Sequence, residues 1–136
     1  MEVGHPPLIP RLLLDTNALS DFAEADPAIM KLLARVQVLA LPVVVVGEYR
    51  FGIAQVRNTN DYNDWLDRLI AQSDVLDITE ETTLHYAAVR LELKRAGKPI
   101  PMNDVWIAAL CRQHELPVLS RDHHFDAVPR IERLDW

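Results

Sequence analysis

The most restrictive feature of the sequence is a series of short apolar runs, each too short for a core helix, that alternate with segments of helical spacing. Strands are predicted at residues 11–14, 36–41, 75–78, 116–120 and 131–136. Helices are predicted at residues 18–23, 27–35, 42–53, 61–72, 79–96 and, from Asn103 or Asp104, to His114. This alternation predicts an α/β fold whose parallel sheet is covered on both faces. Sites in such sheets form at the carboxyl ends of the strands.

The segment around Pro42 is ambiguous. Residues 43–46 are four consecutive valines, which favour a strand. Proline is disfavoured inside a central strand but is common in the first turn of a helix. We therefore expect a strand that ends at Leu41 and a helix that begins at Pro42 and carries Glu48.

Length and composition limit the class of protein. The chain has 136 residues, of which 49% are hydrophobic, and this fits one domain with a sizeable core. The prolines among the first ten residues suggest an extension at 1–10, followed by a single domain at 11–136. The longest apolar run, residues 39–46, is too short for a membrane span of about 20 residues.

The single cysteine and the net charge add two further limits. One cysteine cannot form an internal disulfide framework, so we expect a reducing, cytoplasmic environment. The formal net charge of -6 argues against a protein that holds nucleic acid by bulk charge. Nucleic-acid chemistry in this chain would therefore depend on a local site.

Acidic side chains lie close to the carboxyl ends of several predicted strands. Asp15 directly follows the first strand, and Glu48 lies on the helix after the second. Asp104 begins the helix before the 116–120 strand, and Asp122 comes soon after that strand. Taken singly, Asp15 and Asp104 are ordinary helix caps, Glu48 a solvated helix residue and Asp122 a turn former. Together, they raise the question of whether the fold brings them to one place.

Four converging carboxylates would require neutralisation. Within about 6 Å, each pair of carboxylates repels by about 3 kcal/mol at an effective dielectric constant near 20. Six such pairs exceed the stability of a typical domain, about 5–15 kcal/mol. Protons or cations must then compensate, and an oxygen-rich cluster suits Mg²⁺ or Mn²⁺.

Other chemistries have weaker support. The adjacent His123 and His124 cannot easily share one zinc ion, and no cysteine pair accompanies them. Cys111 lies among apolar residues of a predicted helix, which favours a buried structural thiol. A phosphate-accepting receiver domain would need adjacent acids after the first strand and a lysine after a late strand, and neither is present.

The sequence resembles the PIN-domain family, and in length and motif order the VapC toxins of type II toxin–antitoxin pairs. The similar segments are residues 13–20 (LLDTNALS), 46–53 (VGEYRFGI), 103–109 (NDVWIAA) and 119–125 (LSRDHHF). The resemblance implies a three-layer α/β/α PIN-like domain with a central, mainly parallel sheet. It also implies a metal-dependent endoribonuclease activity.

The resemblance also implies roles for individual residues. The acidic residues of the family correspond to Asp15, Glu48, Asp104 and Asp122, as catalytic residues and as ligands of Mg²⁺, with Mn²⁺ as the alternative ion. Asp15 and Asp104 are the most secure of these ligands. Thr16 and Ser120 fall at positions of supporting hydroxyls. His124 stands where many relatives have a second acid, and we do not count it as a ligand.

The implied partners are an RNA substrate, with transfer RNA and ribosomal RNA as candidates, a cognate VapB-type antitoxin and a second copy in a homodimer. Contacts outside the acidic residues must select RNA, and the arginines near the predicted site are Arg11, Arg50, Arg112 and Arg121. A groove for the antitoxin could be lined by Tyr49, Phe51, Tyr62 and Trp65, with core packing as the competing explanation. The alternative function is a catalytically silent PIN-fold module that binds RNA or protein. Such a module is expected to lose an acid, and all four are present.

Overall fold

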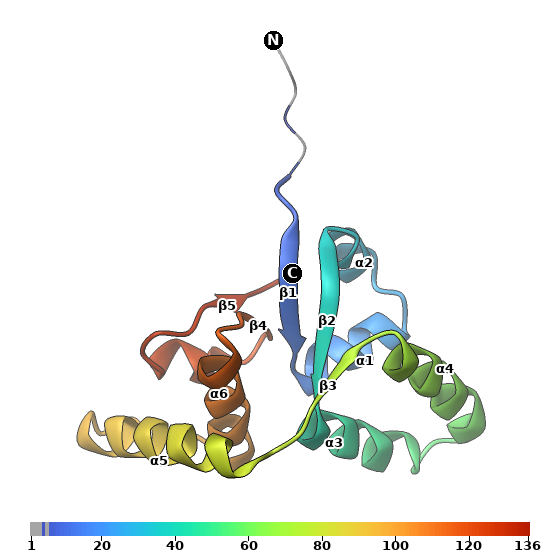
Figure 1. The fold of residues 1–136 in the computed structure, drawn as a ribbon. Helices are drawn as coiled ribbons and strands as arrows, with labels where there is room; N and C mark the ends of the chain where they lie inside the picture. Colours follow the sequence, from blue (N-terminus) through green and yellow to red (C-terminus); the bar gives the residue numbers. More distant parts are fainter. Residues whose placement is uncertain (1–3, 5) are drawn as a thin grey trace.

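The fold is a parallel sheet with helices on both faces (Figure 1). The computed structural model describes residue 4 and residues 6–136. The strands are β1 (Ile9–Leu14), β2 (Val36–Pro42), β3 (Asp74–Leu76), β4 (Val118–Leu119) and β5 (Arg133–Leu134). The helices are α1 (Thr16–Ala23), α2 (Pro27–Leu33), α3 (Val43–Ile53), α4 (Thr59–Ala71), α5 (Glu80–Arg95) and α6 (Met102–His114), with a 3₁₀ helix, η1, at His123–Ala127. The predicted α/β class with a parallel sheet is confirmed.

The strand order β3-β2-β1-β4-β5 shows where the chain reverses its direction across the sheet. The chain proceeds outward from β1 through β2 to β3, and α5 and α6 then return it to β4 on the other side of β1. In Figure 1, α5 and α6 lie on the opposite side of the sheet from α1, α2 and α4. The boundary between β1 and β4 is therefore a topological switch point, where a crevice opens at the carboxyl ends of the strands.

The register of β1 against β4 fixes which residues meet at this boundary. Leu13 pairs with Val118 and Leu14 with Leu119. The backbone N–H of Asp15 continues the pattern by donating to the carbonyl of Leu119 at 3.1 Å. The first residues beyond the two strands, Asp15 and Ser120, are consequently neighbours.

Burial explains the continuous apolar run of β1. Leu12, Leu13 and Leu14 are each 0% exposed, because helices cover both faces of this central strand. Ile29 of α2 and Ala108 of α6 complete the same core. Among the described residues, no helix is both long enough and apolar enough to cross a membrane.

The ambiguity at Pro42 is resolved nearly as predicted. Pro42 is the last residue of β2 and the N-cap of α3, so the four valines after it are helical. Val45 is fully buried and Tyr49 is 5% exposed one turn later. Burial of one face of α3 therefore overrides the strand propensity of valine.

The ends of β1 and β4 differ from the prediction. β1 begins at Ile9, two residues before the predicted strand, and includes Pro10. Pro10 is tolerated because β4 pairs only with Leu13 and Leu14, which leaves one side of residue 10 without a strand. β4 is reduced to Val118–Leu119, since Pro117 precedes it and the chain turns away at Ser120.

Helical spacing in the sequence predicts that the buried side of α5 consists of Leu84, Ala87, Ala88, Leu91 and Leu93, and this prediction is largely wrong. Of the predicted residues, only Leu93 is buried, whereas Leu84 is 71% exposed and Leu91 45% exposed. The other exposed members of the predicted set are Ala87 and Ala88. α5 instead packs against α6 through the side that carries Val89 and Leu93. Apolar residues occur on two sides of this helix, so periodicity alone could not select the buried one.

A first prediction concerns the buried hydroxyl of Tyr49, the one buried side-chain polar atom without a hydrogen-bond partner among the described residues. We expect Tyr49→Phe to raise the free energy of unfolding by about 0.5–1 kcal/mol, because it removes an unpaired buried group. Tyr62→Phe is the control, since the Tyr62 hydroxyl donates to Glu24 and its removal should reduce stability. Thermal unfolding followed by circular dichroism tests both variants. A less stable Tyr49→Phe would show that this hydroxyl has a partner after all.

Candidate active site

Asp15 is the buried centre of the candidate site, at the junction of β1 and α1. It is 6% exposed and is the N-cap of α1, where its Oδ1 accepts from the backbone N–H of Thr16 at 2.8 Å. Its Oδ2 accepts from the Ser120 hydroxyl at 2.6 Å. The backbone N–H of Asp122 in turn donates to the Ser120 oxygen at 2.9 Å. Ser120 therefore joins the carboxyl end of β1 to the loop after β4.

Glu48 reaches the same place from α3. Its Oε2 accepts from the Thr16 hydroxyl at 2.8 Å, and its Oε1 accepts from the Asn103 amide. Each carboxylate oxygen of Glu48 thus has a donor, one from α1 and one from the first turn of α6. These two contacts fix the orientation of a half-buried acid.

Asp104, Asp122 and His124 form a compact group on the other side of the site. One ligand atom from each lies within 4.8 Å of the others. The Nδ1 atom of His124 is 3.1 Å from Oδ2 of Asp104 and 2.8 Å from Oδ1 of Asp122. The imidazole therefore sits between two carboxylates, in a position that a cation would also favour.

Asp104 does not have the capping role predicted from sequence. α6 begins at Met102 with Pro101 as its N-cap, so neither Asn103 nor Asp104 caps it. Asn103 instead contacts Glu48, and Asp104 faces His124. The first turn of α6 thus supplies two polar side chains to the site.

The pKa values report the convergence of the acids. Burial raises the pKa of Asp15; the hydrogen bonds from Ser120 and Thr16 oppose the rise, and the Asp122 and Glu48 carboxylates add to it. Burial, followed by the Asp122 carboxylate, raises the pKa of Asp104 to about 6, with a further contribution from Asp15. Each of the two acids therefore senses the charge of its neighbours.

The donor set fits a divalent cation. The ligand atoms that lie together are carboxylate oxygens from Asp104 and Asp122 and one imidazole nitrogen from His124, which are ligand types that divalent metal ions bind. Burial is the main cause of the raised pKa values of Asp15 and Asp104, and repulsion by the neighbouring carboxylates adds to it. A cation among them would relieve this repulsion. His124, set aside on sequence grounds, belongs to the candidate ligand group by its position.

The four candidate arginines do not gather at the acids. Arg11 lies four residues before Asp15 on β1, about 13 Å away along the strand, and pairs with Asp74. Arg112 lies eight residues after Asp104 on α6, about 12 Å along the helix, and donates to Glu92 and to the carbonyl of Pro129.

Arg50 and Arg121 lie nearer, but their donors are engaged within the fold. Arg50 donates to Asn63 and Asp67 and so ties α3 to α4. Arg121 directly follows Ser120, pairs with Asp21 at 3.3 Å and stacks on Trp136, with its Cζ 4.4 Å from the ring centroid.

Two asparagines have roles that sequence reasoning missed. Asn103 donates to Glu48. Asn17 donates to the Ser120 hydroxyl at 3.3 Å and accepts from the backbone N–H of Arg121 at 3.3 Å. Both lie one or two residues from a predicted ligand, which is the signal that could have identified them.

The fold and the site together define a class: a three-layer α/β/α domain with acidic residues that converge at the switch point of a parallel sheet. The model of the PIN domain family matches residues 12–131, and the chain belongs to this family.

Individual relatives are similar over most of the chain. Toxin FitB of Neisseria gonorrhoeae is 31% identical over 122 residues, which cover 82% of this chain and 87% of that protein. Ribonuclease VapC5 of Mycobacterium tuberculosis is 29% identical over 92 residues, which cover 66% of this chain and 68% of that protein. The crystal structure of FitAcB from Neisseria gonorrhoeae matches with a TM-score of 0.78 and 28% identity, covering 90% of this chain and 96% of that chain.

A second prediction follows from the raised pKa of Asp104. The ordinary pKa of an aspartate is 3.8, and that of Asp104 in the folded protein is about 6. Between these two pH values, Asp104 keeps a proton in the folded protein that it has lost in the unfolded chain. Its contribution to stability therefore falls as pH rises. In the absence of divalent metal, we expect Asp104→Asn to be more stable than the wild type by about 1–2 kcal/mol at pH 7.5, an advantage that disappears near pH 3.5.

Thermal unfolding at several pH values, with EDTA or with Mg²⁺, measures this effect. Mg²⁺ should raise the unfolding temperature of the wild type at pH 7.5 but not that of Asp104→Asn. Asp126→Asn is the opposite-sign control, because hydrogen bonds from Arg133 lower the pKa of Asp126. A wild type that is more stable than Asp104→Asn in EDTA at pH 7.5 would contradict the repulsion described here.

Proposed function

We propose that the chain is a metal-dependent endoribonuclease toxin of a type II toxin–antitoxin pair, inhibited by a VapB-type antitoxin. The observation that carries the proposal is the convergence of Asp15, Asp104 and Asp122 at the switch point, with Glu48 held beside them through Thr16. Membership of the PIN domain family and the similarity to the VapC5 ribonuclease and the FitB toxin support it.

The carboxylates of Asp15, Asp104, Asp122 and Glu48 would hold Mg²⁺, with Mn²⁺ as the alternative. When bound, such an ion polarises the scissile phosphate and lowers the pKa of a coordinated water. Ser120 and Thr16 keep the Asp15 and Glu48 carboxylates turned toward the site through their hydroxyl hydrogens. Either Glu48 or Asp122 would accept the proton of the attacking water on a carboxylate oxygen.

The expected reaction is hydrolysis of an RNA phosphodiester that leaves a 5′-phosphate and a 3′-hydroxyl. The acids act on the phosphate alone, and the ribose 2′-hydroxyl takes no part in this attack. Selection of RNA, with transfer RNA and ribosomal RNA as candidate substrates, therefore depends on contacts outside the acidic cluster.

A third prediction tests the catalytic role of Asp15. Asp15→Asn retains a helix-capping side chain but removes a negative charge, and we expect it to reduce the rate of RNA cleavage in Mg²⁺ by at least about 100-fold. Asp26→Asn is a matched control, because Asp26 caps α2 through the same kind of contact away from the site. Cleavage of a panel of structured RNAs, with end-group analysis and an EDTA arm, measures both.

The outcomes separate the two candidate functions. Cleavage in Mg²⁺ that is lost in EDTA and in Asp15→Asn, but retained in Asp26→Asn, supports the nuclease. RNA or protein binding without any cleavage would favour the catalytically silent PIN-fold module. Cleavage that persists in EDTA would contradict a metal-dependent mechanism.

For the antitoxin, an aromatic surface spans α1, α3 and α4. Tyr49 is 5% exposed and belongs to the core, so for this residue core packing, and not a place in the antitoxin groove, is the correct explanation. Trp65 packs edge-on against Phe22, with ring centroids 5.3 Å apart. Phe51, 72% exposed on α3, is the residue of this group most accessible to a partner. An amphipathic segment of the antitoxin would dock its apolar side here.

A fourth prediction concerns the expected homodimer. Leu84 and Leu91 are exposed on the same side of α5, seven residues apart, and provide an apolar surface for a second copy. We expect the wild type to sediment as a dimer and Leu84→Glu to sediment as a monomer with unchanged secondary structure. Leu8→Glu, at an exposed leucine near the other end of the sheet, serves as the control. A monomeric wild type, or a Leu84→Glu variant that still dimerises, would exclude this surface.

A further inference from the structure

Six of the 14 basic side chains pair with carboxylates, and the other eight have no carboxylate within 4.0 Å among the described residues. The six that pair are Arg11, Arg50, Arg112, Arg121, Arg130 and Arg133. Four of the other eight are spread over residues 31–68, at Lys31, Arg35, Arg57 and Arg68. The remaining four lie together in the segment at residues 90–98. They are Arg90, Lys94, Arg95 and Lys98, and all are exposed. A chain with a net charge of -6 therefore keeps a local excess of free positive charge at one end of α5.

Arg90 and Lys94 line a groove between α5 and the start of α6. The groove has a volume of about 360 Å³, and Met102 and Val105 of α6 form its other wall. Arg90 and Lys94 are one turn apart, so their side chains point the same way, with about 6 Å between their positions along the helix. Attraction of basic residues to a helix C-terminus accounts for Lys94 and Arg95 in the last turn of α5, but not for Arg90, more than one turn earlier.

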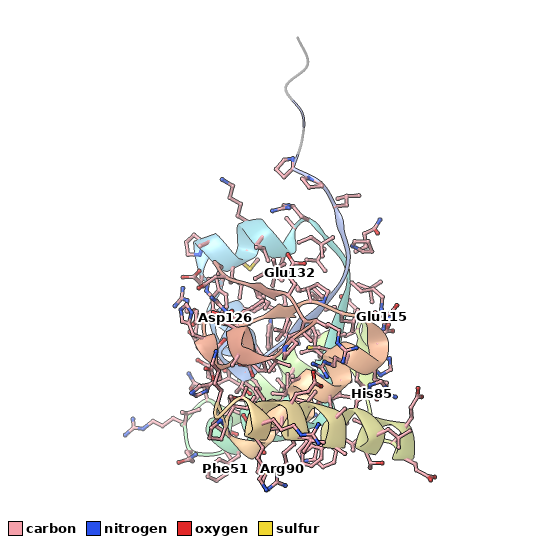
Figure 2. The ribbon with its side chains drawn as sticks, turned by 90° about the vertical axis from the view of Figure 1, so that its left-hand side faces the viewer. Phe51, His85, Arg90, Glu115, Asp126 and Glu132 are labelled. Atoms are coloured by element: carbon pink, nitrogen blue, oxygen red, sulfur yellow. The ribbon has the colours of Figure 1, made fainter. Side chains whose placement is uncertain are left out.

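The groove adjoins the acidic site through the first turn of α6. Asn103 and Asp104 face Glu48 and His124, while their neighbours Met102 and Val105 line the groove. One helical turn therefore has the acids on one side and the basic groove on the other. In Figure 2, Arg90 lies at the same end of the molecule as Phe51 of α3, the helix that supplies Glu48.

A short chain of contacts holds Arg90 in place beside this turn. Its Nη1 donates to the Tyr86 hydroxyl at 2.9 Å, and that hydroxyl lies 3.0 Å from the sulfur of Met102. The Tyr86 ring stacks on Trp106 of α6, with centroids 4.0 Å apart and planes inclined by 24°. The guanidinium is thereby positioned without an acidic partner among the described residues, which leaves its charge available to a ligand.

We propose that Arg90 and Lys94 bind the backbone phosphates of the RNA substrate on one side of the scissile bond, with Arg95 and Lys98 adding to the attraction. The inference rests on the proposed ribonuclease function and specifies where the substrate lies. A single strand that places one phosphate at the acids would continue past Met102 into the groove. The acids repel a polyanion, and the groove supplies opposite charge on the other side of the same helical turn. Backbone contacts of this kind position RNA without selecting its sequence.

The test measures binding of a fluorescein-labelled, unstructured 20-nucleotide RNA of mixed sequence by fluorescence anisotropy. All variants are made in the Asp15→Asn background with Mg²⁺, so that the RNA stays intact, and binding is measured from 50 to 200 mM salt. We expect Arg90→Ala with Lys94→Ala to weaken binding about tenfold at 100 mM salt. The slope of log affinity against log salt should decrease in magnitude by about 1.4, or about 0.7 for each lost phosphate contact.

Matched controls separate charge from structure. Lys94→Ala alone should decrease the magnitude of the slope by about 0.7. Lys31→Ala removes the same charge from α2, at the other end of the molecule, and should leave the slope unchanged. Arg90→Lys should restore most of the affinity that Arg90→Ala loses, since it keeps the positive charge. An unchanged unfolding temperature in each variant excludes a general loss of structure.

Other results would overturn the proposal. If the double variant and Lys31→Ala have the same slope as the parent, or if the parent binds no RNA at 50 µM, this groove does not hold the substrate. Cleavage kinetics in the otherwise wild-type protein distinguish this failure from that of the nuclease itself. The double variant should raise KM with little change in kcat. A protein that binds RNA through the groove but cleaves none would contradict the proposed activity and leave the present inference intact.

Discussion

The alignment of β1 with β4 is the constraint on which the rest of the site depends. Because Leu14 pairs with Leu119, the next residues, Asp15 and Ser120, must lie side by side at the edge of the sheet. A shift of one residue in this register would place a different side chain beside the Asp15 carboxylate. Burial of the three leucines of β1 makes such a shift costly, so the hydrophobic core holds the polar site in register.

The same residues serve the fold and the site. Asp15 satisfies a free N–H at the start of α1 and also faces the acidic cluster. In α6, by contrast, Pro101 occupies the N-cap position, and the acid of the first turn is free to face the cluster. Asn103 and Thr16 each hold one oxygen of Glu48, so the helices that bring the acids together also orient them. Asp15, Asp104 and Asp122 thus lie at or next to the ends of helices and strands, and Glu48 reaches them from the middle of α3.

Sequence reasoning predicted the architecture, because the order of strands and helices depends on local patterns. The structure also brings Asp15, Asp104 and Asp122 together, with Glu48 held beside them through Thr16, and their roles as ligands stay a prediction. The alternation of apolar runs predicted the strand and helix order, and Asp15 directly follows β1, whereas Asp122 lies three residues after the end of β4. Sequence reasoning failed where the burial of a residue depends on tertiary contacts. Leu84 and Leu91 are exposed because α6 packs on another side of α5, and no periodicity within α5 encodes that choice.

The arginine predictions illustrate the same limit. Arg112 is predicted to lie near the site, whereas the structure shows it bound to Glu92 and to the carbonyl of Pro129, two turns along α6 from Asp104. The two basic residues that line the groove, Arg90 and Lys94, instead belong to α5, which packs on α6. The position of His124 between Asp104 and Asp122 could not be predicted from the sequence, because it depends on the turn that η1 makes after β4.

The mutual repulsion of the buried acids has an evolutionary consequence. A substitution that removes the charge of Asp104 removes a buried carboxylate and relieves its acidic neighbours, so at this position we expect loss of the ligand to be accompanied by a gain in stability. In a lineage where cleavage ceases to be useful, nothing in the fold opposes the drift of Asp104 to asparagine, since the helix that carries it has its own cap. A descendant without activity would keep the groove and the scaffold intact. In a duplicated copy of such a gene, loss of the Asp104 charge would therefore increase stability and leave a protein that binds RNA without cleaving it.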